Sequence, residues 1–220
     1  MKKSVILDFD NTIGFFEQII FLINIIEKTY NESLNTIEIS NIIEYYPKIF
    51  RPKLFEIIQF ILYFQKNKRI NLFILYTRNT KPHFVEAIIS FLEKKIDNTN
   101  IFNYILYEKT KQKNIKTILE NIQKEEIDNN LLCFIDNKYF KYEIDDSNIK
   151  YIKCKNYNYK YEISEIIKYF PYHIYHKINK NLIKLYFQHK KNNKKKQLPY
   201  SLYELNSSFI LQSIEDFIQI

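Results

Sequence analysis

The chain has 220 residues, of which 46% are hydrophobic and 17% aromatic, and its formal net charge is +8. This composition can bury a sizeable core, which excludes a disordered chain. Two cysteines exclude a disulfide framework, and no stretch approaches the roughly 20 uncharged apolar residues of a membrane span, so we expect a soluble intracellular protein, cytoplasmic or nuclear, without a membrane partner.

The sequence V-I-L-D-F-D-N-T-I-G occupies residues 5–14. Its uninterrupted apolar start predicts a buried parallel strand. Asp8 and Asp10 follow at the carboxyl end, where open α/β sheets bind their ligands. Gly14 is the one glycine in the chain, which indicates a backbone demand such as a positive φ.

Two carboxylates at a strand end predict metal or phosphate chemistry. Mg²⁺ prefers oxygen ligands, and a carboxylate can also attack phosphorus. The alternative is that Asp8 and Asp10 belong to a solvated turn. The apolar strand before them, together with Thr12 and Gly14 after them, favours the functional interpretation.

Three helices are expected next. The first two cover residues 15–30 and 36–46, and Thr36 is the expected N-cap of the second, with an incomplete capping box. The third opens after residue 50 and continues to residue 66. We expect Arg51, at its start, to be a surface or cap residue.

A second strong strand is predicted over residues 70–76, and it ends at Thr77 and Arg78. The helix predicted over residues 83–96 begins close to this strand end. Its unpaired N–H groups and positive dipole end can therefore face a bound phosphate. The alternative for Thr77 is a simple turn or cap residue.

Three more elements follow. Four lysines precede a helix that ends near residue 123, and any of them can equally be a solvated surface residue. A third strong strand over residues 131–135 ends at Asp136 and Asn137, and another follows over residues 149–154. Alternating strands and helices predict an α/β fold with a parallel sheet and right-handed crossovers.

The order of these elements resembles that of the haloacid-dehalogenase-like phosphohydrolases. D-F-D-N-T resembles their first motif, D-x-D-x-[TV], and Thr77 resembles their second, a strand-end hydroxyl. Their third motif, a Lys at a helix start, is best matched by Lys111, with Lys109 and Lys113 as runners-up. The strand-end pair at residues 136–137 resembles the fourth motif.

The resemblance covers roughly residues 4–155 and implies a Rossmann-like core in residues 1–155. Residues 15–49 would form a small helical cap insert, although ordinary packing helices are an equal alternative. Residues 156–220 would form a basic helical extension. The R-P pair at residue 51 and the I-D-N sequence ending at residue 137 also resemble the polymerase-tail phosphatase branch.

The resemblance implies a Mg²⁺-dependent phosphatase. Asp8 would be the nucleophile that forms an aspartyl-phosphate, and Asp10 the general acid and base. The residues implied to bind the phosphate are Thr77, Arg78 and Lys111. Those implied to hold Mg²⁺ are Asp8, Asp10, Asp136 and Asn137. The substrate would be a small phosphate ester, a nucleotide or a phosphoprotein.

The C-terminal region suggests a second hypothesis. Residues 151–220 carry 12 Lys and 5 acidic residues, a net charge of +7, and helices are expected near 162–170, 172–189 and 202–220. The basic run from Lys190 to Lys196 would contact nucleic acid or an acidic partner, or form a solvated loop. The alternative to an enzyme is therefore an inactive binding module that uses this half.

Overall fold

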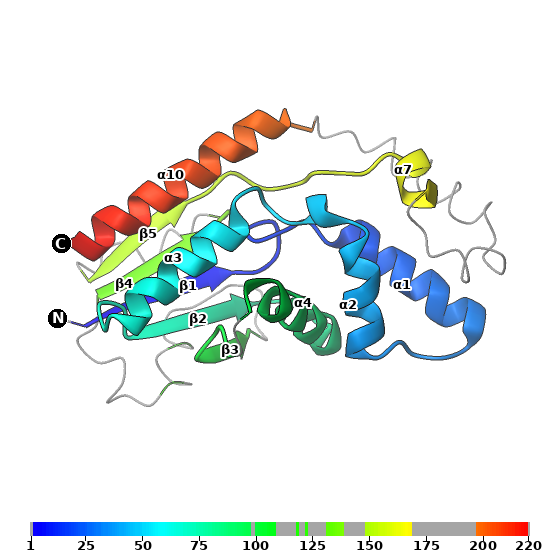
Figure 1. Cartoon of the computed structure of the whole chain (residues 1–220), viewed down its shortest axis with the longest axis horizontal. Helices are drawn as coiled ribbons and strands as arrows, with labels where there is room; N and C mark the ends of the chain where they lie inside the picture. Colours follow the sequence, from blue (N-terminus) through cyan, green and yellow to red (C-terminus); the bar gives the residue numbers. More distant parts are fainter. Residues whose placement is uncertain are drawn as a thin grey trace.

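A five-stranded parallel sheet organises the protein in the computed structural model (Figure 1). The structure describes residues 2–97, 100–108, 118, 122, 131–138, 148–168 and 197–219. The strands are β1 (Lys3–Asp8), β2 (Leu72–Thr77), β3 (Tyr104–Tyr107), β4 (Leu131–Asp136) and β5 (Ile149–Lys153), in the order β3-β2-β1-β4-β5. The predicted α/β fold, a Rossmann-like parallel sheet flanked by helices, is confirmed.

Strand β1 lies in the centre of the sheet and is buried on both faces. Successive side chains of a strand point to opposite faces. Val5 and Leu7 accordingly belong to the larger hydrophobic cluster, and Ile6 belongs to the smaller one on the other face. Ile118 and Ile122 pack in that smaller cluster. This two-sided burial explains why the strand sequence is uniformly apolar.

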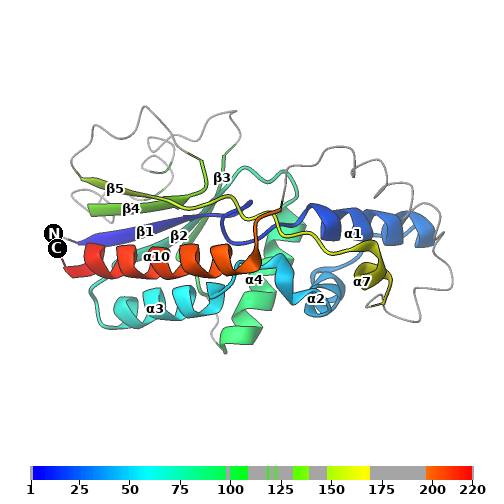
Figure 2. The same ribbon diagram turned by 90° about the horizontal axis from the view of Figure 1, so that it is seen from above.

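The helices with described bounds are α1 (Glu17–Tyr30), α2 (Thr36–Glu44), α3 (Leu54–Lys66), α4 (Pro82–Ile96), α7 (Ile163–Lys168) and α10 (Tyr200–Gln219), with a short 3₁₀ helix η1 (Pro47–Ile49). Helices α3, α4 and α10 lie on one side of the sheet (Figure 2). Helices α1 and α2 lie beyond the carboxyl ends of the strands (Figure 1), and α2 packs against α4. Their role as a cap insert stays a prediction.

The N-cap of α2 differs from the expected one. Asn35 is the cap, and its side chain accepts hydrogen bonds from the backbone N–H groups of Ile37 and Glu38. The Glu38 carboxylate accepts the backbone N–H of Asn35 in return, so the capping box is complete. Thr36 was the wrong choice because it already lies in the first helical turn.

Helix α10 is part of the same core as the sheet. Its side chains Ile210, Ile214 and Phe217 belong to the cluster that contains Val5 and Leu7. The core therefore continues beyond residue 155, although the predicted domain boundary there stays a prediction. The expected helix at 172–189 and the run from Lys190 to Lys196 lie outside the described residues.

In the part of the chain that the structure describes, no helix combines the length and the apolar character needed to cross a membrane.

Candidate active site

Three side chains lie at the carboxyl ends of three neighbouring strands. Asp8 ends β1, Thr77 ends β2 and Asp136 ends β4, and the strand register places them within one residue of the same level. Their exposed fractions are 5%, 0% and 1%. The chain places β2 and β3 on one side of β1, and then β4 and β5 on the other, so the strand order reverses between β1 and β4. The carboxyl ends of the strands at such a reversal form the usual ligand crevice of these sheets.

The Asp8 carboxylate is held by the loop that follows β1 and by the end of β4. Thr12 Oγ1 donates to Asp8 Oδ2 at 2.5 Å. The same hydroxyl oxygen accepts the backbone N–H of Asn137 at 3.0 Å, and the N–H of Lys138 donates to Asp136 Oδ1 at 2.7 Å. These bonds fix the orientation of both carboxylates, so the edge of the sheet carries a preorganised acidic pair.

The amide of Asn137 lies between the two carboxylates. One of its two polar atoms is 3.2 Å from Asp8 Oδ2 and 3.1 Å from Asp136 Oδ1. If that atom is the nitrogen, it donates to both. If it is the oxygen, the nitrogen donates to Asn156 Oδ1 at 2.6 Å, and three oxygens then converge, which is a set that suits a hard cation.

Only the second orientation places an amide oxygen beside the two carboxylates for Mg²⁺. The first, with the Asn137 nitrogen between the carboxylates, is the one that satisfies its hydrogen bonds, and it leaves Asp8 and Asp136 as the oxygen ligands. Among the residues that the structure describes, no group of three or more His, Cys, Asp or Glu side chains is arranged to hold a metal ion. Asp8, Asp136 and Asn137 lie together at this edge, and their role as metal ligands stays a prediction. The predicted contribution of Asp10 to metal binding stays a prediction.

Asn79 links the first two predicted motifs. Its side-chain nitrogen donates to Asp10 Oδ1 at 3.2 Å, and its backbone N–H donates to Thr77 Oγ1 at 2.9 Å. Arg78, which lies between Thr77 and Asn79 in the chain, is half-buried. The sequence reasoning missed Asn79, although its position directly after a strand-end Thr-Arg pair was a usable signal.

The lone glycine has a steric role. Gly14 does not have a positive φ, so that expectation is wrong, and it is Asn11 that takes the left-handed conformation, with φ 63°. A Cβ on Gly14 would lie 2.5 Å from the Phe16 ring and 2.6 Å from the Ile49 carbonyl oxygen. Gly14 is needed because the loop after β1 passes this close to its neighbours.

Arg51 is a buried clamp on that loop and not a surface residue, so the surface expectation is wrong. Its exposed fraction is 2%. The guanidinium donates to the backbone oxygens of Thr12 at 2.5 Å, Asn11 at 3.3 Å and Lys155 at 2.6 Å, and to Asn206 Oδ1 at 2.9 Å. One side chain thus joins the loop after β1 to the segment after β5 and to α10.

The clamp is reinforced from α10. Asn206 Oδ1 also accepts the backbone N–H of Lys155 at 2.9 Å. Burial lowers the pKa of the Arg51 guanidinium, and neighbouring groups, Asp8 among them, oppose this shift. Sequence reasoning missed Asn206 because nothing near it in the chain marks its distant partner.

Cys154 lies beside the clamp and stays a thiol. Burial raises its pKa to about 11, and its Sγ is 3.8 Å from Thr12 Oγ1 and 3.6 Å from an Arg51 nitrogen. A thiol of this kind is a weak nucleophile at neutral pH, because the thiolate is the reactive form.

The predicted catalytic lysine Lys111, and its runners-up Lys109 and Lys113, lie outside the described residues.

Comparison of the chain with models of protein families, with curated proteins and with solved structures found no match. The grouping of Asp8, Thr77 and Asp136 is therefore the observation on which a functional hypothesis depends.

Proposed function

We propose that this protein is a Mg²⁺-dependent phosphatase that acts through an aspartyl-phosphate. The observation that carries the proposal is the meeting of Asp8, Thr77 and Asp136 at the carboxyl ends of three adjacent strands. The resemblance of the motif order to the haloacid-dehalogenase-like phosphohydrolases supports the same reaction.

The reaction consists of two displacements at phosphorus. An oxygen of Asp8 attacks, the new O–P bond forms, and the bond to the leaving oxygen breaks while Asp10 gives that oxygen a proton. Asp10 then takes a proton from water, which attacks the same phosphorus and releases phosphate from Asp8. The hydrogen bond from Asn79 holds the Asp10 carboxyl in position beside the strand ends.

Thr77 and Arg78 are the proposed phosphate ligands from β2. Because Thr77 Oγ1 accepts a backbone N–H, its hydroxyl proton can be donated to a phosphate oxygen. The guanidinium of Arg78 suits two phosphate oxygens at once. Lys111 remains the proposed further cation.

Asp8, Asp136 and Asn137 would hold Mg²⁺. When bound there, the ion would neutralise charge on the phosphate and on the two carboxylates. The proposed substrate is either a small phosphate ester or nucleotide, or a phosphoprotein. Helices α1 and α2 lie on the side of the molecule toward which the strand ends point, so they are the elements expected to restrict access (Figure 1).

The test is hydrolysis of p-nitrophenyl phosphate with Mg²⁺ and with EDTA, by the wild type and by Asp8→Asn. The matched control is Asp216→Asn, which makes the same change at an exposed position of α10. We expect Mg²⁺-dependent activity that falls by about a thousandfold or more in Asp8→Asn and is unchanged in the control. Mass spectrometry of the quenched wild type should find phosphate on Asp8.

A folded wild-type protein that is inert across metals and pH would contradict the enzyme proposal. So would activity that survives in Asp8→Asn. Salt-dependent nucleic-acid binding by such an inert protein would instead support the binding-module hypothesis.

A further inference from the structure

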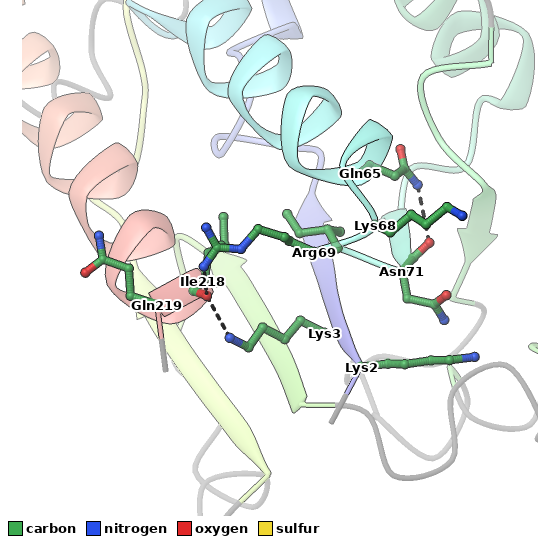
Figure 3. A pocket seen from close by; sticks show the side chains of 9 residues that line it. Lys2, Lys3, Gln65, Lys68, Arg69, Asn71, Ile218 and Gln219 are labelled. Atoms are coloured by element: carbon green, nitrogen blue, oxygen red, sulfur yellow. Dashed lines mark hydrogen bonds between the residues drawn. The ribbon is translucent and has the colours of Figure 1, made fainter.

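A hollow of about 780 Å³ lies at the amino edge of the sheet, the edge opposite the candidate active site (Figure 3). Four segments contribute to it: the start of β1, the end of α3, the turn between α3 and β2, and the end of α10. β1 spans six residues between the two edges, so Lys3 and Asp8 are separated by about 17 Å at 3.3 Å per residue. A small molecule bound in the hollow cannot reach Asp8.

The described lining of the hollow is strongly basic. Four of its nine residues are Lys2, Lys3, Lys68 and Arg69, and none of the nine is acidic. Pockets for apolar ligands are lined mostly by hydrophobic and aromatic side chains, and this one is not. The composition therefore favours an anion.

Two of the cations share one carbonyl oxygen, and each also lies over an aromatic ring, Lys3 over Phe217 and Arg69 over Phe64. Lys3 Nζ donates to the Ile218 carbonyl oxygen at 2.7 Å, and Arg69 donates to the same oxygen at 3.1 Å (Figure 3). The whole C-terminus of a helix carries the equivalent of only about half a negative charge, against two full positive charges here. Burial, and then the positive charge of Arg69, lower the pKa of Lys3.

The other two cations, Lys2 and Lys68, are exposed and extend away from Ile218 (Figure 3). Backbone hydrogen bonds fix the turn that carries Lys68 and Arg69. The N–H of Arg69 donates to Phe64 O at 2.9 Å, and Lys68 takes a left-handed φ of 59°. Lys68 and Arg69 are thus presented by a turn whose backbone is fixed, which lowers the entropic cost of binding.

We propose that this hollow binds a small anion that carries two or more phosphate groups. One group would lie at Lys3 and Arg69, and a second would lie toward Lys2 and Lys68. A nucleic-acid strand is less well suited, because its backbone is normally followed by an extended groove of cations with aromatic side chains, whereas these four cations are confined to one hollow.

The test is titration of the full-length protein with tripolyphosphate by isothermal calorimetry at low ionic strength. The variant is Lys2→Gln with Lys68→Asn, in which Asn suits the left-handed backbone at residue 68. Neither side chain takes part in the contacts that hold Ile218, so α10 should stay in place. The control is Lys28→Gln with Lys94→Gln, which removes the same charge from exposed positions on α1 and α4.

We expect the wild type and the control to bind alike, and the affinity of the Lys2/Lys68 variant to fall at least about tenfold, with binding that weakens as salt is added. Equal affinity of variant and control would overturn the proposal, as would no detectable binding by the wild type. A single-stranded oligonucleotide that binds through Lys2 and Lys68 and is not displaced by tripolyphosphate would overturn the assignment to a small anion.

Discussion

Replacement of Arg51 by Lys should destabilise the protein because it opens the clamp on the loop that follows β1. The guanidinium donates to four oxygen acceptors, three backbone carbonyls and the Asn206 side chain. An ammonium group concentrates its donors at one point and cannot span the same set. Asn11 O and Asn206 Oδ1 keep a backbone N–H donor, from Tyr157 and Lys155, so the loss falls on the carbonyl oxygens of Thr12 and Lys155, at about 1–3 kcal/mol each. We expect the free energy of unfolding to fall by about 2–4 kcal/mol, a large part of the 5–15 kcal/mol typical of a domain.

Urea unfolding followed by circular dichroism measures this loss. With a slope of about 2 kcal/mol per molar urea, the midpoint should fall by about 1–2 M. The matched control is Arg69→Lys, the same substitution at an exposed position with one carbonyl contact to Ile218, for which we expect less than about 1 kcal/mol. If Arg51→Lys loses no more stability than Arg69→Lys, the hydrogen bonds to the loop do not hold it and the reasoning is refuted.

Four further predictions concern local features. Gly14→Ala should lower stability by about 1–3 kcal/mol in urea unfolding, because no space exists for its Cβ, and a wild-type midpoint would disprove the steric role. Asn35→Ala should cost about 1 kcal/mol in the same assay and Thr36→Ala clearly less, whereas the reverse order would make Thr36 the cap. Burial raises the pKa of Cys133 to about 12 and that of Cys154 to about 11, so a thiol reagent at pH 8 should label both only after unfolding. Both pKa values exceed the ordinary 9.0, so the stability that these thiols contribute should be fully present below about pH 9 and be lost as the pH rises to 11–12. A urea midpoint that is unchanged between pH 8 and pH 10.5 would contradict this prediction.

The sheet was predictable because its strands are buried on both faces. A fully covered strand needs an unbroken apolar run, and the runs before Asp8, Thr77 and Asp136 have this character. The proximity of these three side chains was predictable too, since parallel strands in one sheet end at the same edge. Local sequence patterns were therefore sufficient to predict both the fold class and the position of the candidate site.

The supports of the site could not be read from such patterns. Arg51 is separated by 39 residues from Thr12 and by 155 from Asn206, and no local periodicity encodes contacts at that range. The expected helix start near residue 50 was early because Lys53 takes a left-handed φ of 58° and delays α3 to Leu54. The first error comes from tertiary contacts and the second from a backbone conformation that the local sequence did not indicate.

The contact between Arg51 and Asn206 has a consequence for synthesis of the chain. Asp8, Thr77 and Asp136 all lie within residues 1–155, which leave the ribosome before α10. Asn206 follows Lys155 by 51 residues, which takes roughly 3–10 s at 5–20 residues per second. Until then the loop beside Asp8 lacks its anchor on the last helix. A nascent chain is therefore expected to form its sheet first and to complete the site only when α10 emerges.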